Sequence, residues 1–122
     1  MRTILLYILL LLSALLTFSC KERPELSSTL DRAETLIWES PDSALQLLEA
    51  LPTSKRIDEE SRARHALLLS QARYRCYIPT TSDSLINIAL EYYQRRSDKT
   101  DELATAWFYK AALAKESQRL IL

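Results

Sequence analysis

Apolar side chains recur at three- and four-residue spacing along most of the chain beyond Glu25, which is the spacing of one face of an α-helix. The pattern divides into predicted helices that begin near residues 24, 41, 58, 84 and 101. Ser40-Pro41-Asp42 offers an N-cap, a first-turn proline and an acidic residue for the positive end of the second helix. The connections are short, so we expect an all-α fold in which consecutive helices form antiparallel αα-hairpins.

The predicted helix from Asp58 to about Tyr77 is apolar on two opposite sides. One side carries Ala63, Ala66, Leu67, Ser70, Tyr74 and Tyr77, and the other carries His65, Leu68, Leu69, Ala72 and Cys76. The arginines are confined to two narrow seams, Arg62 with Arg73 and Arg64 with Arg75. A helix with two apolar sides packs between neighbours, so we expect this one to be an inner element of a stacked array.

A short motif recurs along the chain. Ser40-Pro41-Asp42-Ser43 returns as Thr81-Ser82-Asp83-Ser84, with Asp42 and Asp83 41 residues apart. The helices before and after also match, because Leu68 and Ala72 correspond to Trp107 and Ala111 at an offset of 39. Internal similarity at a period of ~20–50 residues is typical of a helical array.

Three features of the chain resemble the tetratricopeptide repeat. Ala72 and Ala111 stand at the close helix crossings, and the larger Leu68 and Trp107 stand one turn earlier. The third feature is the segment A-L-Q-L-L-E-A-L-P, which ends at Pro52. The resemblance covers residues 33–52 and 65–93, with the last helix as a weaker third piece, at a period longer than the usual ~34 residues. It implies about two and a half stacked hairpins over residues 26–122. More narrowly, the chain resembles the N-terminal part of Bacteroidetes lipoproteins that carry such repeats.

The first twenty residues have the pattern of an export signal. Arg2 precedes an apolar run from Ile4 to Phe18, which is shorter than the ~20 residues of a membrane span. The end on Ser19-Cys20 resembles a bacterial lipobox. It implies a signal peptide over residues 1–19, a lipidated Cys20, an anchor over residues 20–25, and attachment to a bacterial envelope membrane, the outer one ahead of the inner. An uncleaved signal anchor and a Cys20 without a role are the open alternatives.

The composition argues against most catalytic chemistry. Glycine is absent, which excludes glycine-rich phosphate loops. His65 is the only histidine and Cys20 and Cys76 lie far apart, so no metal-ligand spacing exists. Lys and Arg total 16, as do Asp and Glu, and this balance gives no overall attraction to nucleic acid. We therefore expect no enzyme activity, no cofactor, no metal and no nucleic-acid partner.

The function expected from the resemblance is a lipid-anchored scaffold or adaptor that binds another protein or peptide. Arg73, Tyr74, Tyr77 and Tyr109 are the candidate partner-binding residues. The alternative is the truncated sensory input part of an envelope-to-cytoplasm transcriptional regulator.

The last predicted helix lacks the polar outer face of a terminal repeat. It carries Trp107 and Phe108 and finishes in Leu120-Ile121-Leu122. Because a terminal repeat normally exposes a polar face, this apolar finish favours a truncated array and self-association through the last helix.

Overall fold

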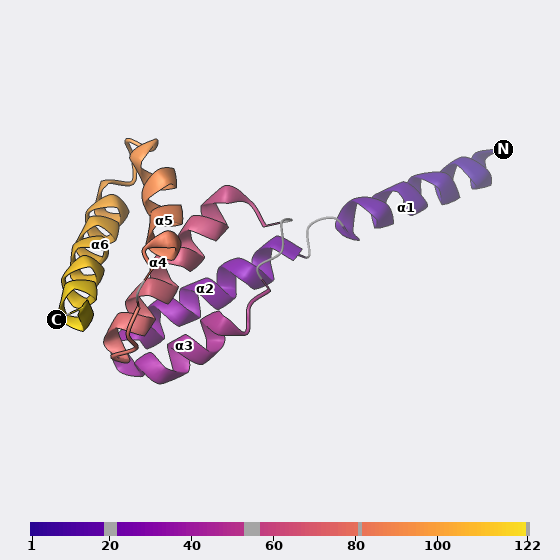
Figure 1. The fold of residues 1–122 in the computed structure, drawn as a ribbon. Coiled ribbons are helices and arrows are strands. Elements are labelled where there is room, and N and C mark those ends of the chain that lie inside the picture. Colours follow the sequence, from indigo (N-terminus) through magenta and orange to yellow (C-terminus); the bar gives the residue numbers. More distant parts are fainter. Residues whose placement is uncertain (19–21, 53–56, 81, 122) are drawn as a thin grey trace.

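The chain forms helices throughout the computed structural model, which describes residues 1–18, 22–52, 57–80 and 82–121 (Figure 1). The helices are α1 (Arg2–Phe18), α2 (Glu22–Glu39), α3 (Pro41–Glu49), α4 (Glu59–Arg75), α5 (Ser84–Gln94) and α6 (Thr100–Ile121). No strand occurs within these ranges. The predicted all-α class is therefore confirmed.

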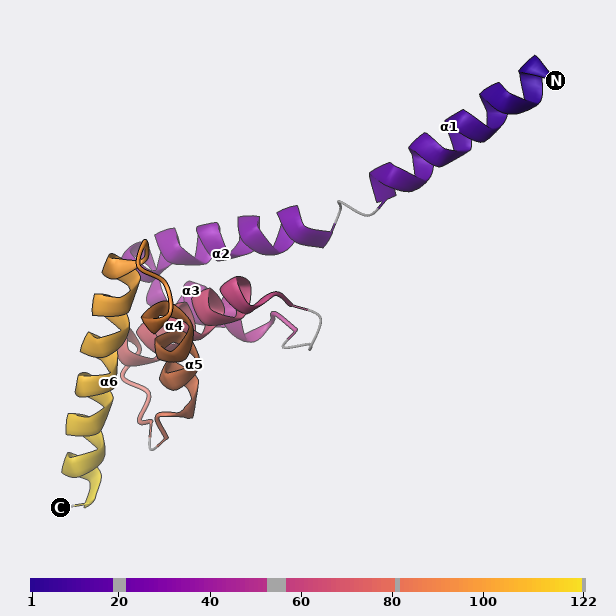
Figure 2. The same ribbon diagram turned by 90° about the horizontal axis from the view of Figure 1, so that it is seen from above.

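Helix α1 lies apart from the other helices in both views (Figures 1 and 2) and packs against none of them. Its apolar side chains from Ile4 to Leu12 are exposed. Over the described residues, no helix combines the length and apolar character of a membrane span. Cys20 lies outside the described residues, and so do the side chains of the predicted apolar finish, Leu120 to Leu122.

The helix ends follow the predicted residues. Ser40 is the N-cap of α3, with Pro41 in its first turn, although the Ser40 hydroxyl donates to the Ser43 hydroxyl rather than capping the backbone. Asp58 is the N-cap of α4, and its Oδ2 accepts a hydrogen bond from the backbone N–H of Ser61 at 3.2 Å. This bond satisfies one of the free N–H groups at the helix start. Glu59 and Glu60 follow in the first turn, where the helix dipole favours negative charge.

Helix α4 is buried on two opposite sides, as its pattern predicts. The first core joins Leu68, Leu69 and Ala72 of α4 to buried side chains of α2 and α3, namely Leu30, Ala33, Ile37, Ala44 and Leu48. The second core joins Ala63, Ala66 and Leu67 of α4 to buried side chains of α5 and α6, among them Ile86, Leu90, Tyr93, Ala106, Tyr109 and Leu113. Figure 1 shows α4 between these two pairs. Because neither core uses α1, residues 22–122 contain both cores complete.

The side of α4 that faces α2 and α3 has a buried counterpart in α6 at an offset of 41 residues. Ala106, Tyr109 and Leu113 of α6 are buried or nearly so, and 41 residues earlier stand His65, Leu68 and Ala72, which face α2 and α3. The offset of 39 expected from residue types is wrong. That offset would pair Trp107, which is 48% exposed, with the buried Leu68, and the exposed Ala111 with the buried Ala72. The repeat of α4 in α6 thus has the same period as the Ser-Asp motif at the starts of α3 and α5.

A charge placed on the first core should unfold the protein. Ala72 is fully buried, so Ala72→Arg must bury a guanidinium or separate α4 from α2 and α3, at several kcal/mol out of a total of about 5–10. Glu91→Arg, on the exposed side of α5, should change stability by less than about 0.5 kcal/mol. Thermal melts followed by circular dichroism compare the two. Equal melting temperatures would contradict the two-sided packing of α4.

Candidate binding groove

An open groove of about 420 Å³ runs along α4 on the side where α2 and α6 flank it. Its walls come from four helices and the connection before α6. The lining side chains are Glu34 of α2, Glu60, Arg64, Leu67, Leu68 and Gln71 of α4, Tyr93 of α5, Lys99 of the connection, and Asp101, Glu102 and Thr105 of α6. The groove forms because α4 packs against neighbours on both of its sides, so that α2 and α6 become the two walls of the groove.

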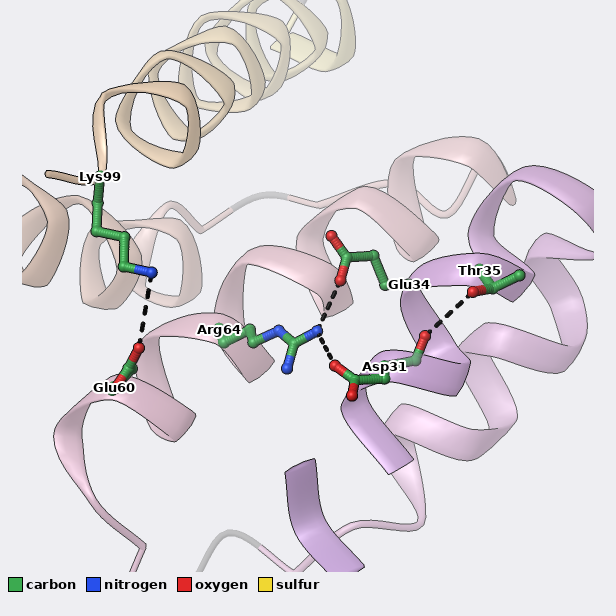
Figure 3. A network of polar contacts seen from close by, with 6 residues as sticks. All are labelled: Asp31, Glu34, Thr35, Glu60, Arg64 and Lys99. Carbon is green, nitrogen blue, oxygen red and sulfur yellow. Dashed lines mark hydrogen bonds and ion pairs between the residues drawn. The ribbon is translucent and has the colours of Figure 1, made fainter. Parts of the chain in front are cut away.

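Ion pairs hold the wall at α2 (Figure 3). Arg64 Nη2 donates to Asp31 Oδ1 at 2.5 Å and to Glu34 Oε2 at 2.6 Å. Partial burial alone would lower the pKa of Arg64, but the hydrogen bonds and the attraction of both carboxylates together raise that pKa above its ordinary value. The carboxylates are more than half exposed, so each pair contributes only ~0.2–1 kcal/mol to stability. The network fixes the Arg64 side chain along the α2 wall.

The groove carries more negative than positive charge. Its carboxylates are Glu34, Glu60, Asp101 and Glu102, against the cations Arg64 and Lys99. Both cations already face carboxylates, because Lys99 Nζ lies 3.8 Å from Glu60 Oε1 and Arg64 is paired as above (Figure 3). The α6 wall therefore presents Asp101 and Glu102 as the excess negative charge. Such a surface attracts a cationic side chain.

The floor of the groove is apolar. Leu67, Leu68 and Tyr93 are buried side chains that contribute only part of their surface to it. Burial, followed by the nearby Glu102 carboxylate, raises the pKa of Tyr93 to about 12. The phenol therefore stays neutral at physiological pH. An apolar floor between charged walls suits a peptide segment with one apolar and one cationic side.

Two of the four predicted partner-binding residues contact each other. The rings of Tyr74 and Tyr109 meet edge to face, with centroids 5.5 Å apart. Tyr109 is only 6% exposed, and burial raises the pKa of its phenol against the opposing effect of a hydrogen bond with Gln71. Tyr109 thus offers little surface to a partner. The groove lining includes none of the four residues.

Tyr77 follows the end of α4 instead of lying in its last turn as expected. The N–H of Ile78 donates to the Arg73 carbonyl and the N–H of Tyr77 to the Tyr74 carbonyl, which is the Schellman arrangement of a helix C-terminus. Tyr77 occupies the left-handed position with φ 57°, where glycine is usual. Its side chain is 89% exposed. A strained and exposed aromatic residue is a candidate contact, although it stands at the end of α4 and outside the groove.

The structure gives the other candidate chemical groups packing roles. His65 Nε2 lies 2.8 Å from the Leu48 carbonyl oxygen, a bond that joins α4 to α3. Burial raises the pKa of the Cys76 thiol, and the hydrogen bond to Asp42 at 3.3 Å adds to this effect, which disfavours the reactive thiolate. Across the described ranges, no three His, Cys, Asp or Glu side chains gather as metal ligands do.

The acidic wall of the groove could not be singled out from the sequence. Asp101 and Glu102 look like the ordinary acidic first turn of a helix, as do Glu59 and Glu60. Their proximity to Glu34 depends on how α2, α4 and α6 are arranged in space. No local pattern in the sequence predicts that arrangement.

No protein-family model, curated protein or solved structure matches this chain. Its function is therefore inferred from its own residues.

Removing the backbone strain at the left-handed Tyr77 should stabilise the protein. Tyr77→Gly removes a penalty of ~1–2 kcal/mol and adds the chain entropy of glycine, for an expected net gain of about 0.5–1 kcal/mol. Tyr77→Ala keeps the Cβ and should give no such gain. Urea denaturation of both variants measures the difference. Equal stability of the glycine and alanine variants would mean that the residue is not strained.

Proposed function

We propose that this chain is a lipid-anchored partner-binding module that holds a cationic segment of another protein in the groove along α4. The observation that carries the proposal is the excess of carboxylates over cations around an apolar floor, assembled from α2, α4 and α6. In this view the helices form a repeat array resembling tetratricopeptide hairpins. The burial of α4 between two helix pairs and the shared 41-residue period support that part.

The groove's chemistry favours a protein segment over a small molecule. Its volume is spread along four helices and open to solvent, whereas small-molecule sites are enclosed and mostly apolar. A segment with alternating apolar and Lys or Arg side chains would contact Leu67 on the floor and Glu102 at the wall. Exposed charge pairs add little affinity but raise association rates and select against acidic partners.

The attachment to a membrane through Cys20 is the second part of the proposal. It rests on the apolar run that ends at Ser19-Cys20 and on the separation of α1 from the rest of the fold. Removal of residues 1–19 would leave both cores intact. Two acyl chains anchor a protein stably where one holds it only marginally.

Charge reversal at the groove tests the binding site. A library of short peptides selected on residues 22–122 should become enriched in Lys and Arg. Glu60→Lys with Glu102→Lys should then weaken the selected peptides by about tenfold or more, or ~1.4 kcal/mol. Glu39→Lys with Glu91→Lys changes net charge equally at exposed positions outside the groove and is the matched control. Equal weakening by both pairs, or enrichment of acidic peptides, would contradict a cation-binding groove.

Labelling with a fatty-acid probe in growing cells tests the anchor. The wild type and Cys76→Ala should incorporate the probe, because the Cys76 thiol, hydrogen-bonded to Asp42, is not the acceptor. Cys20→Ala should lose the label and leave the membrane fraction. If Cys20→Ala is labelled as strongly as the wild type, lipidation at this residue is wrong.

A further inference from the structure

Helix α6 exposes an apolar face that the repeat pattern marks as a packing surface. This open face consists of Ala104, Trp107, Phe108 and Ala111, with Trp107 48% and Phe108 60% exposed. At ~100° per residue, these side chains span about 100° of the helix, opposite the buried Ala106, Tyr109 and Leu113. Over the described residues no helix covers it.

The internal repeat indicates what such a surface does. The positions 41 residues earlier are Ala63, Ala66, Leu67 and Ser70 of α4, all buried. Ala63, Ala66 and Leu67 belong to the second core, where α5 and α6 cover them. The open face of α6 is thus the repeat equivalent of a surface that binds helices in this same chain. It also carries larger apolar side chains, because Trp107 and Phe108 replace Ala66 and Leu67.

We infer that the open face binds the open face of a second copy, with the two α6 helices antiparallel. The spacing of the face is symmetric about the point between Trp107 and Phe108, with an alanine three residues beyond each. In an antiparallel pair centred there, Trp107 of each copy meets Phe108 of the other, and Ala104 meets Ala111. This self-complementarity is what a two-fold symmetric interface requires, and the alanines allow the helices to approach closely.

Charge supports the same orientation. Asp101 lies near one end of the open face and Lys115 near the other, both exposed and on the same edge of α6. In the antiparallel pair, Asp101 of each copy comes within one residue's rise, ~1.5 Å along the axis, of Lys115 of the second copy. In a parallel pair the two-fold axis would run along the helices, so Asp101 and Lys115 of the two copies would lie on opposite edges of the contact and would not meet. The antiparallel arrangement therefore has two attractive charge pairs that the parallel one lacks.

The pairing leaves the groove open. Leu113 and Tyr109 of α6 face the interior, and Glu102 and Thr105 line the groove, whereas the open face lies on the outer side of the helix. Asp101 belongs to both, because it lines the groove and also lies beside the open face. One helix from each copy makes a contact at the small end of specific interfaces, ~1,200 Å². We therefore expect a reversible dimer. Because Asp101 is shared, self-association and peptide capture are separated by variants of Trp107 and Phe108, which do not line the groove.

Sedimentation equilibrium of residues 22–122 tests the dimer, since this part holds both cores complete. The wild type should dimerise at roughly 10 μM, where an affinity in the micromolar range becomes visible. Trp107→Glu with Phe108→Glu should weaken the dimer by about a hundredfold or more, because carboxylates would be buried without partners. Trp38→Glu with Tyr77→Glu alters two exposed aromatic residues outside the open face and should leave the dimer intact.

A charge exchange tests the orientation and separates it from unspecific association. Asp101→Lys alone and Lys115→Asp alone should each weaken the dimer, and the combined variant should restore it. A monomeric wild type, an unchanged dimer in Trp107→Glu with Phe108→Glu, or no rescue by the charge exchange would overturn the proposal. Peptide binding measured on Trp107→Glu with Phe108→Glu should remain, so failure of the groove and failure of the dimer are told apart.

Discussion

The fold depends on a single helix that must be buried on two sides. Helix α4 has no single apolar face to place against one partner, because Leu68 and Ala72 point toward α2 and α3 while Ala66 and Leu67 point toward α5 and α6. A helix of this kind gains stability only between two neighbours, since either apolar side left in water would oppose folding. The other helices are arranged around this requirement, and the groove along α4 follows from it.

The charged residues fit the same arrangement. Arginines on α4 occur only at the seams between its two buried sides, and those of one seam, Arg64 and Arg75, reach outward to α2. Arg64 contacts two carboxylates, and Arg75 lies over the ring of Trp38 at 4.7 Å. These contacts are individually weak at partly exposed sites. They pair Glu34 of α2 with Arg64, which leaves Asp101 and Glu102 as the unbalanced charge of the groove.

The periodicity of the sequence predicted the helices and the two-sided packing of α4, because both follow from local spacing. It could not predict which face of α6 is buried. Trp107 and Ala111 match Leu68 and Ala72 in type, and only the contact with α5 reveals that Tyr109 and Leu113 take the inner positions. It also missed the left-handed Tyr77, since a glycine-free chain gives no residue signal for that turn. The groove could not be predicted for a similar reason, because the residues of its walls are distant in sequence.

The shared helix also sets an order for synthesis. The first core is complete once α4 has emerged, whereas the second core waits for α5 and α6. During that interval Ala63, Ala66 and Leu67 form an uncovered surface that any α5–α6 pair fits, including one from another nascent chain. The connection between Arg75 and Ser84 is the only covalent link that makes the correct pair the nearest one. Its length therefore governs the competition between intramolecular folding and exchange of α5 and α6 between chains.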